Sequence, residues 1–287
     1  MPLSQNSFEG YRMRNCLGRV LLAFLMLGAL SVHSAQPAEK PIINPPPTAK
    51  DWAELGALPD WSGVWNPHIS DQDRKHKSEP PPWNAKAAAL IKFQEAELRA
   101  GRPTPLFTNC LPEAHPSWMM ISHNAMEILF TPGRVTMLGE SDPGRLRRIY
   151  TDGRPHPADP DPTFHGHSIG RWEGDTLVVD TVGVLPQVYI ASSEAHGVPN
   201  QGDMRVIERI RLAKPDELHV QMKVMAPHVL TKEYETTRIW FRQRARKFDI
   251  VEGVCQEGWY APRIDKDGWH VWVPQPHDVG GNRIPPP

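Results

Sequence analysis

The chain has 287 residues and a formal net charge of −1, and it contains 31 Pro, 13 His and 10 Trp beside only 3 Cys. This length suits one large or two small domains and allows a sizeable core without disulfide bonds. The near-zero charge argues against a nucleic-acid binder that works through a broad basic face. Proline at about twice its usual frequency excludes long uninterrupted helices as the main structure. The hydrophobic content of 39% is too high for a disordered chain and too dispersed for a multi-span membrane protein.

The N-terminal segment has the pattern of a signal peptide. Three arginines precede the apolar run 20–32, which is too short to span a bilayer as a helix. Ser34 and Ala35 then supply the small residues at which a signal peptidase cleaves. The alternative is a buried helix at the N-terminus of the fold. We expect residues 1–35 to be removed and the mature protein to be periplasmic or secreted, without a stable membrane anchor.

Two cysteines, Cys110 and Cys255, remain in the mature chain. In an oxidising compartment an isolated pair of cysteines is more often a disulfide than a reactive site. We therefore expect these two residues to form a disulfide bond, with a nucleophilic cysteine as the alternative.

Composition divides the rest of the chain into three parts. Residues 36–50 are proline-rich and are typical of an extended linker, and residues 274–287 form a second proline-rich segment. We expect the intervening residues 51–273 to form a single β domain. Helix formers at 85–100 follow Asn84, which can cap a helix, and precede a glycine that can end it. One helix is therefore expected there.

Short segments with strand-like composition fill most of this domain, and turn residues separate them. The aromatic stretch 52–65 leads into a first strand. Nine more strands, all antiparallel, are expected at 126–130, 134–138, 145–151, 166–172, 176–182, 204–212, 217–225, 234–242 and 248–254. The spacing predicts a mainly β fold, an antiparallel β-barrel or sandwich that is lipocalin-like in outline, with one flanking α-helix.

A carboxylate falls on the apolar face of one expected strand. Side chains alternate between the two faces of a strand, and along 204–212 this places Glu208 among apolar residues. A buried carboxylate must be paired or have a raised pKa, and either state suits a general base. The alternative is a structural salt bridge, with Arg148 or Arg238 as the partner.

Histidines gather beside the most regular hairpin. His156, His165 and His167 lie close together in the sequence, and a two-residue turn at 174–175 would make His167 a diagonal neighbour of Asp180. A carboxylate beside a histidine orients the imidazole and keeps its other nitrogen available for proton transfer. We expect His167 to be a proton shuttle and Asp180 to orient it. The alternative is a polar pair at the rim of the sheet.

A metal site is the second interpretation of these histidines. His165 and His167 are two residues apart and would share a strand face, and Glu173 follows. Cupin-type sites use a similar His-x-His and glutamate, but their spacing is shorter and their flanking glycines differ. For this reason we expect no metal. The chain also has no phosphate-cradling loop and no dinucleotide fingerprint, so we expect no other cofactor.

Arginines and aromatic residues complete the candidate site. Arg154 or Arg171 would stabilise an anion or oxyanion near the histidines. Tyr150, Trp172 and Trp240 would line an apolar pocket for a small hydrophobic or aromatic molecule, as small barrels often do. For any single tryptophan, an ordinary place in the core is the alternative.

Two segments resemble a known group of proteins. The sequences RRIYTDGR at 147–154 and GHSIGRWEGDTLVVDT at 166–181 resemble the signature of a family of secreted, mostly uncharacterised bacterial all-β proteins. The resemblance covers roughly Trp61 to Cys255. It implies a common fold, but no established activity comes with it.

The leading hypothesis is an exported acid–base enzyme, a cofactor-independent lyase, isomerase or hydrolase that acts on a small aromatic or polycyclic compound. This mechanism requires His167, Asp180 and Glu208 to converge. The alternatives are a non-catalytic periplasmic binding protein for a hydrophobic ligand and a metal-dependent enzyme that uses the His-x-His site. None of the three involves nucleic acid.

Overall fold

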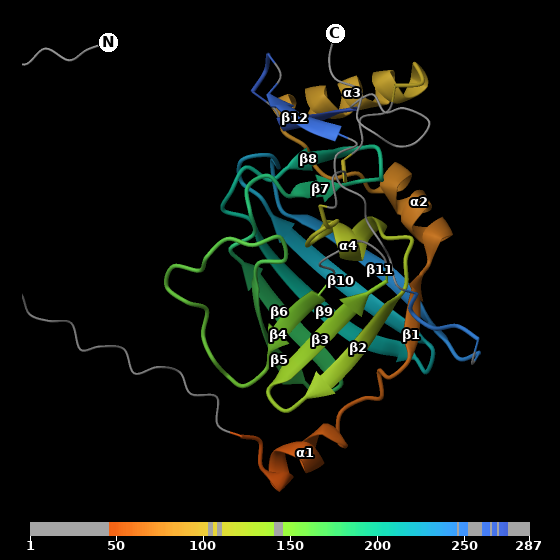
Figure 1. Ribbon diagram of the computed structural model, residues 1–287, viewed down its shortest axis with the longest axis vertical. Helices are drawn as coiled ribbons and strands as arrows, with labels where there is room; N and C mark the ends of the chain where they lie inside the picture. The colour runs from red at the N-terminus through yellow and green to blue at the C-terminus, as the bar shows by residue number, and fades with distance from the viewer. Residues whose placement is uncertain are drawn as a thin grey trace, which may run out of the picture. The chain divides into compact units, whose positions relative to one another are not determined.

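Nine strands close into a barrel in the computed structural model of the protein (Figure 1). The structure describes residues 46–102, 106–107, 111–140, 146–245, 247–251, 260–264, 266–268 and 270–274. The barrel strands are β1 (Val64–Pro67), β2 (Met126–Thr131), β3 (Arg134–Gly139), β4 (Leu146–Tyr150), β5 (His167–Glu173), β6 (Thr176–Val182), β9 (Arg205–Lys214), β10 (Glu217–Met225) and β11 (Tyr234–Gln243). They pair in the order β1-β11-β10-β9-β6-β5-β4-β3-β2, and β1 also pairs with β2. The predicted β-barrel is confirmed.

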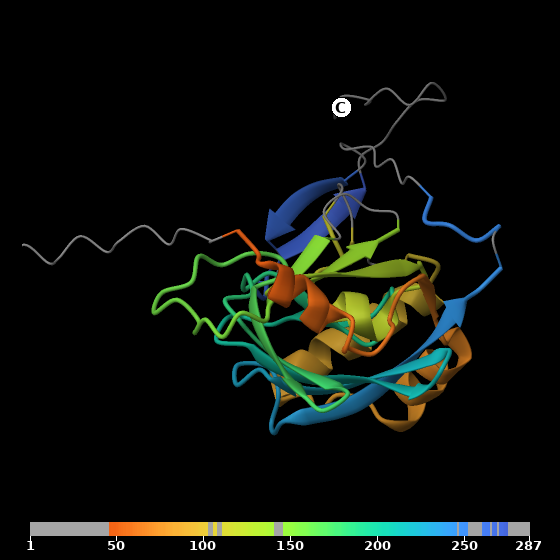
Figure 2. The ribbon, with the colours of Figure 1, turned by 90° about the horizontal axis from the view of Figure 1, so that it is seen from below.

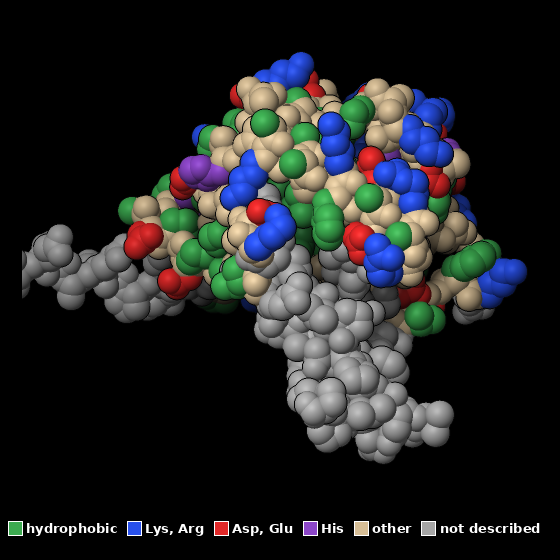
Figure 3. All heavy atoms as spheres, turned by 90° about the horizontal axis from the view of Figure 1, so that it is seen from above, with side chains coloured by type: hydrophobic (Ala, Val, Ile, Leu, Met, Phe, Trp, Pro, Cys, Tyr) green, Lys and Arg blue, Asp and Glu red, His purple; other side chains and the backbone are tan. Residues whose placement is uncertain are grey.

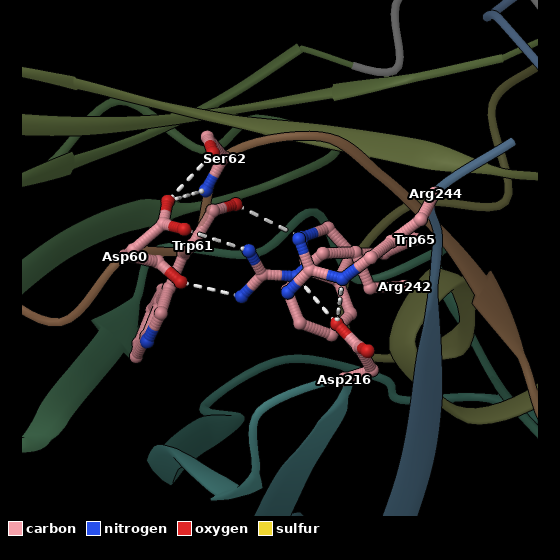
Figure 4. A network of polar contacts seen from close by, with 7 residues as sticks. All are labelled: Asp60, Trp61, Ser62, Trp65, Asp216, Arg242 and Arg244. Atoms are coloured by element: carbon pink, nitrogen blue, oxygen red, sulfur yellow. Dashed lines mark hydrogen bonds and ion pairs between the residues drawn. The ribbon is translucent and has the colours of Figure 1, made fainter. Parts of the chain in front are cut away.

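The short strand β1 closes the ring because it pairs with β11 on one side and with β2 on the other. An arginine on β11 fastens this closure (Figure 4). The Arg242 guanidinium donates to the Asp60 carboxylate at 2.9 Å, lies 3.5 Å from the Asp216 carboxylate and packs over the Trp65 ring at 4.6 Å. Hydrogen bonds from Ser62, and then from Arg242, lower the pKa of Asp60 to about 2. The Asp60 carboxylate is therefore negatively charged at neutral pH.

Four helices and two hairpins accompany the barrel in the described residues. They are α1 (Ala49–Leu55), α2 (Ile69–Ser78), α3 (Ala85–Arg99), α4 (Ser117–Ile121), the hairpin of β7 (Tyr189–Ala191) and β8 (Gly197–Pro199), and the hairpin of β12 (Tyr260–Ile264) and β13 (His270–Pro274). The expected helix is α3, and the Asn84 side chain caps it by accepting from the Ala87 backbone N–H at 2.9 Å. Figure 3 views the molecule from above, the side on which Figure 1 draws α3, and shows Lys and Arg side chains among hydrophobic ones.

Helix α4 lies across one end of the barrel, below the β7–β8 hairpin, and all five of its residues are buried (Figures 1 and 2). Four fully buried tryptophans, Trp61, Trp65, Trp118 and Trp240, belong to the surrounding core. The barrel is therefore filled by side chains and by α4 rather than open from end to end.

Three local predictions are wrong. Strands β4 and β5 are parallel, because the long connection 151–166 carries the chain across before β5 enters the sheet. Residues 248–251 form no strand, and the remainder of the expected strand 248–254 lies outside the described residues. The expected linker 36–50 is helical at its end, because Thr48 and Asp51 form a capping box that starts α1 at Ala49.

Candidate functional site

The β5–β6 hairpin has the expected register. Ile169 pairs with Asp180 and His167 pairs with Val182, so His167 and Asp180 are diagonal neighbours on one face. Gly174 occupies the turn with a φ of +64°, a conformation that favours glycine. Asp180 and His167 lie on the outer face of the barrel, since the side chains that alternate with them, Thr181 and Ser168, are buried inside.

His156, from the connection between β4 and β5, joins the two predicted residues. Its Nδ1 lies 2.9 Å from His167 Nδ1, a hydrogen-bond distance, and its Nε2 lies 3.6 Å from Asp180 Oδ2. Arg205 on β9 holds the Asp180 carboxylate with two hydrogen bonds, one of them 2.9 Å long. His156 therefore lies between Asp180 and His167. The sequence had predicted a direct contact between Asp180 and His167.

Two other predicted residues join this cluster from the end of β4. The Tyr150 ring stacks on the His167 ring, with centroids 5.4 Å apart and planes 23° apart. The Arg154 guanidinium lies over the Tyr150 ring, 4.1 Å from its centre, and forms an ion pair with Asp152. Tyr150, Arg154, His156, His167 and Asp180 thus form one connected group, which we call the outer relay.

Charges in the outer relay are set by burial and by the neighbouring arginines. Burial, followed by His156 and Arg154, lowers the pKa of His167 below its ordinary value, so His167 is neutral at pH 7. Burial opposes ionisation of Asp180, but the hydrogen bonds and the charge of Arg205, together with His156, outweigh it, and the pKa of Asp180 is lowered. The relay therefore joins a carboxylate anion to a neutral imidazole that can accept a proton.

Glu208 lies on the opposite face, inside the barrel, as its strand parity predicted. It is fully buried and forms an ion pair with Arg147 on β4, through Nη1 at 3.0 Å and through Nη2. Arg147 also donates to Ser168 and to Thr181, at 2.9 Å for the latter. The partner is neither Arg148 nor Arg238, since Arg148 points outward and Arg238 donates to the Met120 carbonyl. His167, Asp180 and Glu208 do not converge, and the predicted three-residue site is wrong.

His115, which the sequence did not single out, lies beside this interior pair. Its Nε2 is 3.7 Å from Glu208 Oε2, and neither ring nitrogen has a hydrogen-bond partner among the described residues. Burial, with Arg147 and His165 nearby, holds the pKa of His115 well below its usual value. The ring is therefore neutral, and no local sequence pattern indicates its position in the core.

The remaining predicted residues lie elsewhere. Arg171 pairs with Glu173 at 2.8 Å on the exposed outer face and does not reach the histidines. Trp172 is partly buried and packs against the core, with its ring 5.2 Å from that of Trp61. Trp240 is fully buried in the core. Neither tryptophan lines the cleft with Tyr150. The alternative of an ordinary core position holds for Trp240, whereas Trp172 lies at the edge of the core.

The two histidines of the His-x-His motif do not share a face. Gly166 between them has a φ of +66°, which breaks the alternation before β5 begins. His165 turns inward and contacts the buried Trp118 edge-on at 5.6 Å, whereas His167 faces outward. Glu173 is held by Arg171 and Arg209. Within the described residues no group of three His, Cys, Asp or Glu side chains is arranged to hold a metal ion.

Two neighbouring hollows lie beside these groups. The first, here called the cavity, has a volume of about 440 Å³ and is lined by Leu106, Phe107, Leu111, Pro112, Glu113, Ala114, Phe164, Gln187, Val188 and Tyr189. The second, here called the cleft, has a volume of about 700 Å³ and is lined by Pro112, Leu146, Arg148, Tyr150, Pro157, Pro160, Asp161, Thr163, Phe164, His165, Gly166, His167 and Ser168. Pro112 and Phe164 border both.

The predicted signal peptide and the predicted disulfide between Cys110 and Cys255 lie outside the described residues. Among the described helices, none combines the length and the hydropathy needed to cross a membrane.

No protein-family model matches the chain, and no curated protein matches its sequence. The resemblance of residues 147–154 and 166–181 to secreted all-β proteins therefore stays a prediction.

Proposed function

We propose that the protein binds a small apolar compound, aromatic or polycyclic, in the cavity. The observation that supports this proposal is the lining, which is mostly aliphatic and aromatic among the described residues and includes Phe107, Phe164 and Tyr189. A volume of about 440 Å³ falls within the range of about 300–1,000 Å³ that ligand pockets usually have. Burial of the ligand's apolar surface would supply the driving force.

Aromatic rings give the cavity its shape. The rings of Phe107 and Tyr189 meet edge-on with centroids 6.3 Å apart, a geometry that lets a planar ligand pack against one face or edge. Burial raises the pKa of Tyr189 to about 12, so its hydroxyl stays protonated and neutral. Glu113 and Gln187 are the polar side chains in the lining, and they would favour one orientation of a ligand that carries a hydroxyl or keto group.

The enzyme built on His167, Asp180 and Glu208 is not part of this proposal. Glu208 is separated from the other two by the barrel wall and is neutralised by Arg147. Binding without chemistry at Glu208 is therefore the function that the interior supports best.

Titration with N-phenyl-1-naphthylamine, an apolar aromatic probe whose emission rises on burial, tests the proposal. We expect saturable binding to the mature protein with a Kd in the micromolar range, about −8 kcal/mol. Leu111→Trp, which places an indole in the lining, should weaken binding at least tenfold. Leu129→Trp is the matched control, because Leu129 is 43% exposed on β2 and lies outside the lining. Equal affinity in both variants would rule out the cavity as the binding site.

We also propose that this binding takes place in the periplasm or outside the cell, after removal of residues 1–35. The basic and apolar pattern of that segment supports export. The intact mass of the exported protein, measured before and after reduction and alkylation, checks both the cleavage and the Cys110–Cys255 bond. A mass that retains residues 1–35, or two alkylated thiols without reduction, would contradict it.

A further inference from the structure

The outer relay ends in the cleft, which places a histidine base beside an aromatic-lined hollow. The His167 ring lines the cleft together with Tyr150 and Phe164. Its Nδ1 is occupied by His156, and in the described part of the chain no hydrogen bond reaches its Nε2. One nitrogen of the imidazole is thus anchored, and the other is left for a bound molecule.

The position of the protons follows from the distances. Two Nδ1 atoms that lie 2.9 Å apart can share only one proton between them. The buried Nε2 of His156 faces the Asp180 carboxylate at 3.6 Å, and an anion favours a proton on the nitrogen that faces it. His156 then presents an unprotonated Nδ1, which accepts from Nδ1–H of His167. This tautomer leaves His167 Nε2 without a proton and able to accept one.

The surroundings keep the relay in this state. Arg205 fixes the Asp180 carboxylate, so the anion cannot turn away from His156. The Tyr150 ring stacks on His167 and restrains the rotation of the imidazole. Arg154 adds a positive charge beyond Tyr150, which disfavours protonated His167.

We propose that His167 Nε2 is a general base that removes a proton from a planar aromatic compound held in the cleft, with His156 and Asp180 as positioning residues. The proposal goes beyond ligand binding in the cavity, and it leaves out Glu208, which the three-residue hypothesis required.

The probe reaction is the ring opening of 5-nitrobenzisoxazole, a planar aromatic compound with an acidified C–H bond. A base takes the carbon-bound proton, the electron pair of that bond forms the nitrile, and the N–O bond breaks to give a coloured cyanonitrophenolate. The proton passes from Nε2 to water, so the reaction needs no oxidant, reductant or other co-reactant.

We expect the mature protein to accelerate this reaction, with a rate that rises with pH as Nε2 loses its proton. The midpoint should lie below the ordinary histidine value of about 6.5. His167→Ala should lower the rate by about 10²-fold, the lower end of what general-base catalysis supplies. His219→Gln is the matched control, because His219 lies on β10 and contacts Glu217 instead.

Two variants separate a positioning role from a structural one. Asp180→Asn and Arg205→Gln break the same ion pair. If the pair only holds the fold, both changes should act in the same direction. In the relay, loss of the Asp180 anion should move the midpoint to lower pH and reduce the rate, whereas loss of the Arg205 cation should move the midpoint to higher pH.

Shifts in the same direction, a wild-type rate in His167→Ala, or no acceleration by the native protein would each overturn the proposal. Circular dichroism confirms that every variant is folded, and His167→Gln replaces His167→Ala if the alanine variant is not. Titration of His167→Ala with N-phenyl-1-naphthylamine separates this inference from cavity binding. His167 lines the cleft but not the cavity, so the variant should lose the reaction and bind the probe as tightly as the native protein does.

Discussion

Glu208 and His167 are both ionisable side chains of barrel strands, and their surroundings give them different chemistry. Glu208 sits in the interior with Arg147, Ser168 and Thr181, which satisfy the ion pair completely. His167 lines the cleft, and among the described residues only His156 forms a hydrogen bond with its ring. A satisfied buried pair holds the fold, whereas a partly exposed base with an oriented tautomer can carry out proton transfer.

Removal of one partner of the buried ion pair between Arg147 and Glu208 should lower the stability of the fold. We expect Arg147→Met to lower the free energy of unfolding by about 3–5 kcal/mol, because it leaves the Glu208 carboxylate buried and unpaired. Arg147→Met with Glu208→Met should recover much of this loss, since no charge then remains inside. Urea unfolding of the single and double variants measures both values. A double variant that is no more stable than Arg147→Met would show that the unpaired Glu208 carboxylate does not cause the loss of stability.

The exposed pair of Lys214 and Glu217 is the matched control for this comparison. Lys214 is mostly exposed, so Lys214→Met should change the free energy of unfolding by at most about 1 kcal/mol.

At the scale of elements, the entry into β5 decides which histidine packs against the buried Trp118 and which joins the outer relay. Gly166 has a φ of +66°, and a Cβ there would lie 2.6 Å from the Val182 carbonyl oxygen. Gly153 has a φ of +81° but nothing within 4 Å of a Cβ position. Both positions favour glycine, but only Gly166 is also enclosed by its neighbours.

We therefore expect Gly166→Ala to be clearly more destabilising than Gly153→Ala. Gly153→Ala should cost about 1 kcal/mol through backbone strain alone, and Gly166→Ala should add a further 1–3 kcal/mol, about the usual cost of overpacking. Thermal unfolding of the two variants compares them directly. Equal losses would mean that β5 shifts to accommodate the new methyl group and that the close approach is not a constraint.

Local sequence patterns predicted some elements well and others not at all. The β5–β6 hairpin and α3 could be predicted because their turn and cap residues, Gly174 and Asn84, have specific backbone roles. Helix α4 could not, since all its residues are buried and no polar face marks its period. The parallel pairing of β4 and β5 depends on where the connection 151–166 runs, which turn chemistry alone does not determine.

At the scale of the whole molecule, the barrel separates the candidate chemistry into an inside and an outside. The spacing of the strand segments predicted a barrel or a sandwich, and the structure has the barrel. Alternation along residues 204–212 placed Glu208 inside, where it lies. The sequence could not predict that His156 would bridge His167 and Asp180, or that His115 would lie beside Glu208. The first contact depends on the path of the irregular connection 151–166, and the second joins segments that are distant in the chain.

Binding of an apolar compound in the cavity is the central claim, and nuclear Overhauser effects between a bound ligand and the protein test it most directly. With N-phenyl-1-naphthylamine bound to the mature protein, we predict contacts from the naphthyl protons to the rings of Phe107 and Tyr189. Contacts confined to the exposed leucines of β2 and β3, Leu129 and Leu138, would place the ligand on the outer wall and contradict the claim.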